Sequence, residues 1–278
     1  MSANPAHPDW NCFARTNAAQ RWRKQSATMG RQMTEAIVEE VRVDPGMKVL
    51  DVACGTGEPA ISLAGLVGES GHVVGIDISG EPLKLAVQRA QQRGLSNIEF
   101  RQGDAHELPF PDHSFDRISS RLGVMFFGDL PRAFREMHRV LRPAGRIALL
   151  VWGPMQQPYF ESTALTIVNM IPGAKIPEAA TAMFRFGDAG VLKGGLEGAG
   201  FREVEEKLRT VDWTWPGTPE EVWEYFQQAT VPFRPLLQGI PEEQRERVNQ
   251  AVLEQIRKYY DGTKINFTAT ARIATGIA

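Results

Sequence analysis

Three carboxylates, Asp51, Asp77 and Asp104, each stand at or just after the end of a short apolar run that predicts a strand. A carboxylate in such a place can accept hydrogen bonds from both hydroxyls of a ribose, or one from the amino group of an adenine. Each charge-assisted hydrogen bond of this kind contributes roughly 1.5–3 kcal/mol. Because the carboxyl ends of the central strands of a parallel sheet share one crevice, we expect the three side chains to face the same ligand.

A glycine loop follows the first of these strands, within the stretch MKVLDVACGTGEPA at residues 47–60. Gly55 and Gly57 lack a Cβ, so the backbone can turn sharply and a ligand can approach the amides at the start of the next helix. Asp51 suits a cationic or hydroxyl-bearing group there, since a carboxylate would repel a pyrophosphate. The loop also fits the dinucleotide fingerprint, with Asp77 about 20 residues further on. A nicotinamide-dependent oxidoreductase is therefore one alternative, and a non-catalytic cofactor-binding protein is another.

The elements that must position these residues alternate between strand and helix. Apolar periodicity, turn residues and helix stop signals predict this order. Strands are expected over 49–52, 72–78, 97–101, 115–120 and 146–152, with helices over 58–67, from Ser79 to Gly94 and from Asp129 to Leu141. Such alternation predicts an α/β fold, a Rossmann-like doubly wound sheet whose first strands are parallel.

Six segments are expected along the chain. A helical N-terminal cap covers 1–44, and an α/β core that binds the cofactor covers 45–152. Helical insertions at 153–199 and 212–262 are interpreted as lids over the ligand-binding end of the sheet. Two further strands complete the sheet, one within 200–211 and a last one within 263–278, where β-branched residues alternate.

The composition describes an ordinary globular protein, with 42% hydrophobic and 23% charged residues and a formal net charge of −2. The absence of a basic excess argues against nucleic acid as a partner. Two cysteines, Cys12 and Cys54, are too few for a disulfide framework or a structural zinc site, so no metal is expected. Neither a signal peptide nor a long apolar run is visible. These features predict a cytoplasmic location without stable membrane insertion.

Four longer motifs occur in order over residues 45–152: VLDVACGTGEPA, VVGIDIS, GDAHELPFPDHSFDRI and REMHRVLRPAGRIALLVW. Together they resemble class I S-adenosylmethionine-dependent methyltransferases, and in particular the branch that contains the ubiquinone and menaquinone biosynthesis C-methyltransferases and many small-molecule methyltransferases. The resemblance implies a seven-stranded sheet with an antiparallel last strand. It also implies S-adenosyl-L-methionine as the cofactor and S-adenosyl-L-homocysteine as the product.

The resemblance further implies a role for each part of the site. The glycine loop would pack against the methionine portion of the cofactor, Asp77 would bind the ribose, and Ile78 would lie beside the adenine. Arg121 would lie by the methionine portion; it is either a structural ion pair or a contact to the cofactor carboxylate or an acidic substrate. The expected cofactor-binding residues are Asp51, Ala53, Gly55, Thr56, Gly57, Asp77, Ile78, Asp104, Ala105 and Arg121.

Methyl transfer from a sulfonium is an in-line displacement, so alignment can supply about 7–11 kcal/mol of the barrier. No motif identifies a catalytic base. His106, in the loop on the adenine side, is the candidate, whereas His113 is expected in a solvated turn and His138 in a structural position. An acceptor that is itself acidic, such as a phenol or quinol, would make a strong base unnecessary.

The segments outside the core are rich in aromatic residues and methionine, which could line an apolar pocket or simply pack helices together. This composition favours a small aromatic or lipophilic acceptor, methylated at carbon or oxygen, with N-methylation of a small molecule as the alternative. A homodimer is one alternative for the assembly of the chain. The candidate substrate-binding residues are Phe13, Trp22, Met125, Trp152, Tyr159, Trp223 and Phe226.

Overall fold

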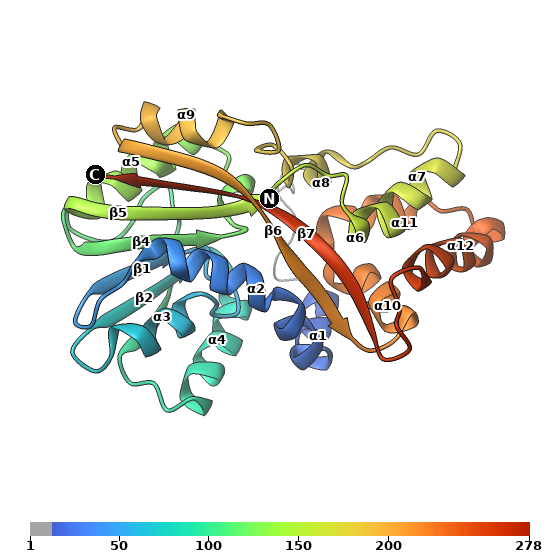
Figure 1. The fold of residues 1–278 in the computed structure, drawn as a ribbon, viewed down its shortest axis with the longest axis horizontal. Helices are drawn as coiled ribbons and strands as arrows, with labels where there is room; N and C mark the ends of the chain where they lie inside the picture. Colours follow the sequence, from blue (N-terminus) through green and yellow to red (C-terminus); the bar gives the residue numbers. More distant parts are fainter. Residues whose placement is uncertain (1–12) are drawn as a thin grey trace. The chain divides into compact units, whose positions relative to one another are not determined.

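The computed structural model describes residues 13–278, with side chains from residue 17 onwards. The chain divides into two compact units, which Figure 1 shows in the colours of the sequence. We call the first the sheet unit (Met33–Gly153, Phe186–Arg209 and Ala271–Ala278). The second is the helical unit (the described residues up to Gln32, together with Pro154–Arg185 and Thr210–Thr270). Three long elements, α2 (Arg23–Val41), β6 (Arg202–Pro216) and β7 (Lys264–Ile277), contribute residues to both units.

A seven-stranded sheet with the order β3-β2-β1-β4-β5-β7-β6 runs through the sheet unit (Figure 1). Its strands are β1 (Lys48–Val52), β2 (His72–Asp77), β3 (Ile98–Gln102), β4 (Phe115–Arg121), β5 (Leu141–Trp152), β6 (Arg202–Pro216) and β7 (Lys264–Ile277). Neighbouring strands from β1 to β5 pair in parallel, and β7 pairs antiparallel with β5. The structure therefore confirms the expected Rossmann-like sheet with an antiparallel last strand.

The strand order reverses between β1 and β4, because β2 and β3 follow on one side and β4 and β5 on the other. Crossovers between parallel strands follow a right-handed rule, which places α3 (Ala60–Val67) and α4 (Gly80–Gln92) on one face and α5 (Leu130–Val140) on the opposite face. Such a reversal opens a crevice at the carboxyl ends of the two central strands. The topology thus fixes where a ligand can bind in this unit.

Local sequence explains where these helices begin. Asp129 precedes α5 and its side chain accepts a hydrogen bond from the Arg132 amide at 3.0 Å, which satisfies one free amide of the first turn. Helix α4 follows Ser79 and buries Leu83, Ala86 and Ala90 along one stripe. Both helices lie where the sequence predicts them.

Helix α9 (Val191–Gly198) packs against α5 within the sheet unit, where Gly195 leaves room for Phe134. A Cβ on Gly195 would lie 2.9 Å from the ring of Phe134. The segment expected as one insertion over 153–199 is therefore divided between the two units. The strand expected within 200–211 also differs, because β6 continues to Pro216.

An ion pair buried inside the sheet unit ties α9 to the last two strands. Arg272 Nη1 on β7 donates to Glu206 Oε1 on β6 at 2.9 Å, and each side chain is only 6% exposed. The same guanidinium donates to the carbonyls of Phe186 and Gly187. Glu206 in turn accepts from the backbone amides of Gly190 and Lys193 at 2.7 and 2.9 Å. One pair of charges thus holds both the turn before α9 and the helix start.

The helical unit contains the remaining helices. They are α1 (Phe13–Arg21), the first part of α2 (Arg23–Val41), α6 (Pro158–Phe160), α7 (Thr166–Met170), α8 (Glu178–Ala182), α10 (Pro219–Ala229), α11 (Arg234–Gln238) and α12 (Arg245–Arg257). A π-helical stretch, Glu161–Leu165, joins α6 to α7, so residues 158–170 form one continuous helical segment. Among the described residues, no helix combines the length and apolar character that crossing a bilayer requires.

Candidate functional site

The carboxyl ends of β1 and β2 bring two of the three acids onto neighbouring strands. Asp51 pairs in register with Gly75, two residues before Asp77. Asp104 follows β3, the next strand in the sheet. All three belong to the sheet unit, as does the glycine loop. The structure therefore places the three predicted acids at or after the carboxyl ends of three neighbouring strands of one sheet.

Asp77 connects the end of β2 to the glycine loop. Its Oδ2 accepts from the Gly55 amide at 2.8 Å, and its Oδ1 accepts from the Ser79 amide at 2.9 Å. The residue is half-buried. These two bonds orient a carboxylate beside the loop, as a ribose-binding role requires.

Asp51 is fully buried, and both of its oxygens have partners in the protein. Oδ1 accepts from the Ser119 hydroxyl at 2.7 Å and Oδ2 from the Ala60 amide at 3.1 Å, at the start of α3. Desolvation raises the pKa of Asp51 to about 7, although these hydrogen bonds and the charge of Arg121 act in the other direction. Asp51 thus links β1 to the start of α3 and to β4. A direct contact between Asp51 and a cofactor stays a prediction.

The glycine loop adopts the conformations for which its residue types are suited. Gly55 and Gly57 have φ angles of +52° and +106°, which favour glycine. A Cβ on Gly57 would lie 2.6 Å from Ile61 Cδ1, whereas one on Gly55 would meet no heavy atom within 4 Å. Arg89 Nη1 donates to the carbonyl and hydroxyl oxygens of Thr56 at 2.7 and 3.0 Å. The loop is thus held by α4 while Gly55 keeps an open side.

Two residues without the freedom of glycine also have left-handed backbone angles at this edge. Ala53 follows β1 and Leu122 follows β4, and both have a φ of +58°. Each such conformation costs on the order of 1 kcal/mol and is concentrated at functional sites. Gly123 follows Leu122, where a Cβ would lie 2.4 Å from that of Ala53. Backbone strain therefore marks the ends of the two central strands.

Ile78 is 60% exposed, so its apolar side chain is available to a ligand. It directly follows Asp77, where an apolar side chain can cover one face of an adenine. Ala105 is buried in the loop after β3. An exposed isoleucine beside an oriented carboxylate fits an adenosyl group, which combines a flat apolar base with ribose hydroxyls.

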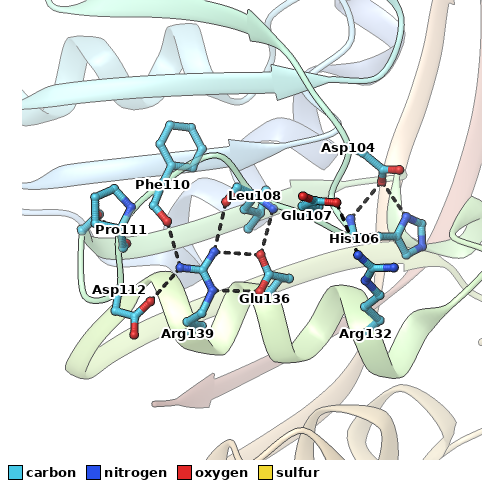
Figure 2. Close-up of polar contacts among 11 residues, drawn as sticks. Asp104, His106, Glu107, Leu108, Phe110, Pro111, Asp112, Arg132, Glu136 and Arg139 are labelled. Atoms are coloured by element: carbon cyan, nitrogen blue, oxygen red, sulfur yellow. Dashed lines mark hydrogen bonds and ion pairs between the residues drawn. The ribbon is translucent and has the colours of Figure 1, made fainter.

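Asp104 and His106 form a compact pair in the loop after β3 (Figure 2). Asp104 Oδ1 accepts from the His106 amide at 2.9 Å and lies 2.6 Å from His106 Nδ1. Desolvation acts to raise the pKa of Asp104, but the two hydrogen bonds from His106 outweigh it and lower the pKa below the ordinary value. Asp104 is therefore ionised at neutral pH and can accept from an amino group.

A second network supports the rest of this loop, as Figure 2 shows. Arg139 of α5 pairs with Glu136 and Asp112 and donates to the carbonyls of Leu108 and Phe110. Glu136 accepts from the Leu108 amide at 2.8 Å. These contacts fix the loop to α5, and the sequence alone did not identify them.

His113 and His138 have structural surroundings. His113 lies in an exposed turn, where its Nδ1 is 2.9 Å from the Leu141 carbonyl oxygen. His138 packs its ring edge-on against Phe201. Arg121 makes a long hydrogen bond of 3.4 Å to the Glu58 carbonyl, and its charge lowers the pKa of Asp51. Arg121 thus faces the loop, and its expected contact to a cofactor carboxylate stays a prediction.

The expected substrate-binding residues fall into both units. Met125 and Trp152 lie buried in the sheet unit. In the helical unit, Tyr159 and Trp223 pack against Phe226 with ring centroids 5.8 and 5.7 Å apart. Burial raises the pKa of Tyr159.

Packing thus accounts for the arrangement of these aromatic rings in the helical unit, where Trp22 also meets Tyr225 edge-on. Their contact with a substrate stays a prediction, and the side chain of Phe13 lies outside the described residues.

Three contacts in the site are not indicated by the sequence. Ser119 is the register partner of Asp51, and its hydroxyl was indistinguishable from any other strand serine. Arg89 lies 33 residues from the Thr56 that it holds. Asp129 was recognised as a helix start, but its amide also donates to His106 Nε2 at 3.2 Å. Long-range partners of this kind leave no local signal.

Comparisons with known proteins agree with this geometry. The family described as "Methyltransferase domain" matches residues 43–165. The chain is 34% identical over 217 residues to the nocamycin O-methyltransferase of Saccharothrix syringae, covering 70% of this chain and 77% of that protein. It is 35% identical over 147 residues to the demethylmenaquinone methyltransferase of Listeria welshimeri, covering 53% of this chain and 58% of that protein.

A similar fold occurs in the crystal structure of a SAM-dependent methyltransferase from Aquifex aeolicus, with a TM-score of 0.52 and 23% identity. The match covers 72% of this chain and 93% of that chain. The chain spans little more than half the length of the demethylmenaquinone methyltransferase, but more than three quarters of the nocamycin O-methyltransferase. The protein is therefore an enzyme that uses S-adenosyl-L-methionine, and it belongs to the class I S-adenosylmethionine-dependent methyltransferases.

Proposed function

We propose that the enzyme transfers a methyl group to oxygen or carbon of a small aromatic or lipophilic acceptor. The similarity to the nocamycin O-methyltransferase carries this proposal, because it extends over 217 residues whereas the methyltransferase domain covers 43–165. Similarity beyond the cofactor core includes segments that can select an acceptor. The aromatic packing of the helical unit is compatible with an apolar substrate. N-methylation and nicotinamide-dependent oxidation are not favoured by these relatives.

Within the sheet unit, we propose that the adenosyl group is held by the residues that already fit it. Asp77 would accept from the ribose hydroxyls, Ile78 would cover the adenine, and Asp104 would accept from its amino group with Ala105 beside it. The glycine loop would pack against the methionine portion. This assignment is supported by the ionised state of Asp104, the exposed side chain of Ile78 and the open space at Gly55.

S-adenosylmethionine supplies an electrophilic methyl group when bound, and the chain's own residues supply its position. Alignment of the acceptor with the methyl and sulfur can contribute about 7–11 kcal/mol to the lowering of the barrier. Both ring nitrogens of His106 are engaged, by Asp104 and by the Asp129 amide. We therefore propose an acceptor acidic enough to lose its proton without a strong base, such as a phenol or an enol.

The acceptor class is tested by following conversion of S-adenosylmethionine to S-adenosylhomocysteine with a panel of phenols, quinols and amines. We expect turnover with a phenol or quinol. Mass spectrometry of the product should then show a methyl group on its oxygen or carbon. Turnover with amines alone would instead assign N-methylation. A cytoplasmic location, the lid role of the two insertions, a homodimer and the exclusion of nucleic acid stay predictions.

Replacing Asp77 by alanine should weaken binding of S-adenosylhomocysteine by about 1.5–3 kcal/mol, since a charge-assisted contact to the ribose is lost. Isothermal titration calorimetry measures this as a rise in Kd of roughly 10- to 150-fold. Asp188→Ala is the matched control, because Asp188 is an exposed carboxylate in the same unit. An unchanged Kd in a folded Asp77→Ala protein would exclude the ribose contact, and thermal stabilisation by NAD instead would point to an oxidoreductase.

Ile78→Ala should also weaken the binding of S-adenosylhomocysteine, by about 1 kcal/mol, because the adenine would cover less apolar surface. The free energy of unfolding should hardly change, since the side chain is 60% exposed in the protein. Leu208→Ala is the control, because Leu208 is 51% exposed on β6 and should affect neither quantity. Calorimetric titration and urea unfolding together check the prediction; equal affinities for wild type and Ile78→Ala would contradict it.

A further inference from the structure

His106 lies between two parts of the sheet unit that are far apart in sequence. Its Nε2 accepts from the Asp129 amide at 3.2 Å, just before α5. An amide N–H can only donate, so Nε2 carries no proton and the ring proton is on Nδ1. Nδ1 therefore donates to Asp104 Oδ1 at 2.6 Å. The geometry fixes the neutral tautomer of His106 and uses both nitrogens.

The consequence for Asp104 is asymmetric. Oδ1 accepts both from the ring and from the backbone amide of His106. Within the described part of the chain, every hydrogen bond accepted by Asp104 ends on Oδ1, and the side chain is 51% exposed. Oδ2 is left to accept from a ligand. Because Oδ1 is held by two hydrogen bonds, the orientation of the whole carboxylate, and so the position of Oδ2, is defined.

The ring of His106 is itself held in place. Its side chain is only 21% exposed and packs against Phe127, with ring centroids 5.6 Å apart. Asp129 begins α5 and accepts from the Arg132 amide, so the amide that His106 contacts belongs to an ordered helix start. His106 thus connects the start of α5 to the loop that carries Asp104. Figure 2 shows the contact between Asp104 and His106.

We infer that His106 is a positioning residue that sets the specificity of the site for adenine, by directing Asp104 Oδ2 at the 6-amino group. The inference rests on the proposed contact between Asp104 and the adenine. It replaces the expectation that His106 acts as a base, because a ring with both nitrogens engaged has none left for the proton of an acceptor.

The test compares S-adenosylhomocysteine with S-inosylhomocysteine, which has an oxygen in place of the 6-amino group. The wild-type enzyme should prefer the adenine compound by about tenfold or more, because a carboxylate accepts from an amino group and is repelled by a carbonyl oxygen. In His106→Ala this preference should fall about fivefold, because the Kd for the adenine compound alone should rise. Binding of the inosine compound should not change, whereas a merely structural loss would weaken both compounds equally.

Two further variants make the test sharper. The amide nitrogen of an asparagine can occupy the place of Nδ1, so His106→Asn should restore the preference. Glutamine extends one bond further, toward the place of Nε2, so His106→Gln should not restore it. Glu107→Gln is the control on the same loop, because Glu107 is 86% exposed and should leave both affinities unchanged.

The outcomes separate the inference from the proposed function. If the wild type fails to distinguish the two compounds, or if Asp104→Asn keeps the wild-type preference, the adenine contact of Asp104 is wrong. If Asp104→Asn loses the preference but His106→Ala retains it, the contact holds and the positioning role is wrong. An equal loss for both compounds in His106→Ala, without rescue by His106→Asn, would also overturn the positioning role.

Discussion

Glu206→Gln should lower the free energy of unfolding by about 3–5 kcal/mol, because it leaves the buried charge of Arg272 without its counter-ion. The carboxylate accepts from one guanidinium and two backbone amides, all of which are donors. An amide in its place offers a single acceptor oxygen and turns its NH₂ group toward another donor. The variant therefore loses both the ion pair and one of the bonds at the start of α9.

Urea unfolding of wild type and variant measures this loss. Glu197→Gln is the matched control, because Glu197 lies on α9 and pairs with Lys193 at the surface, with 51% and 44% of the side chains exposed. Exposed pairs of this kind contribute about 0–1 kcal/mol, so the control should be nearly neutral. Equal, small losses in both variants would show that the pair in the sheet unit is not a stabilising contact.

Asp51→Asn should change how stability depends on pH. The pKa of Asp51 is about 7 in the folded protein, against an ordinary value of 3.8. Between these values the folded protein keeps a proton that the unfolded chain releases, so the free energy of unfolding falls as pH rises through this window and levels off above pH 7. Asparagine has no such proton. From pH 5 to pH 8 the variant should therefore gain roughly 3 kcal/mol relative to wild type.

The asparagine can keep the local contacts, which makes the comparison clean. Its oxygen can accept from the Ala60 amide while its NH₂ group donates to the Ser119 hydroxyl, which both donates and accepts. Ser119→Ala is an independent check, since the hydroxyl lowers the pKa of Asp51. Its removal should move the fall in stability toward higher pH. Parallel pH profiles for wild type and Asp51→Asn, from urea unfolding at each pH, would exclude a raised pKa.

The α/β core could be predicted from the sequence because its signals are local. The strand ending at Val52, the glycine turn and the Ser79 and Asp129 helix starts each depend on residues within a few positions of one another. The antiparallel last strand came from the resemblance to a family and is confirmed by its pairing with β5.

Two differences have physical causes. Strand β5 begins at Leu141, earlier than the expected 146, because Leu141 pairs with Phe115 before the register shifts, and no local pattern contains that partner. The extension of β6 does have a local signal, since Val211, Trp213 and Trp215 alternate with polar residues and are buried. This period-two alternation indicates a strand, so the expected helical insertion from residue 212 is wrong at its start.

In the site, residue types predicted which groups are present but not how each is used. Asp51 and Asp77 are both carboxylates at strand ends, yet one is fully buried against Ser119 and Ala60 while the other remains half-buried beside the loop. Likewise, the second hydrogen-bond partner of His106 is the amide of Asp129, 23 residues away. Burial and long-range hydrogen bonds depend on the fold, so no local pattern in the sequence contains them.

The pair of backbone amides that hold Asp77 bears on the thermodynamics of cofactor binding. Immobilising a side chain on binding costs about 0.5–1.5 kcal/mol in lost rotamer freedom. Because the Gly55 and Ser79 amides already fix both carboxylate oxygens, little of that entropy remains to be lost when a ligand arrives. Asp77 is thus preorganised for the ribose contact proposed above, and that contact would lose little affinity to the ordering of the side chain.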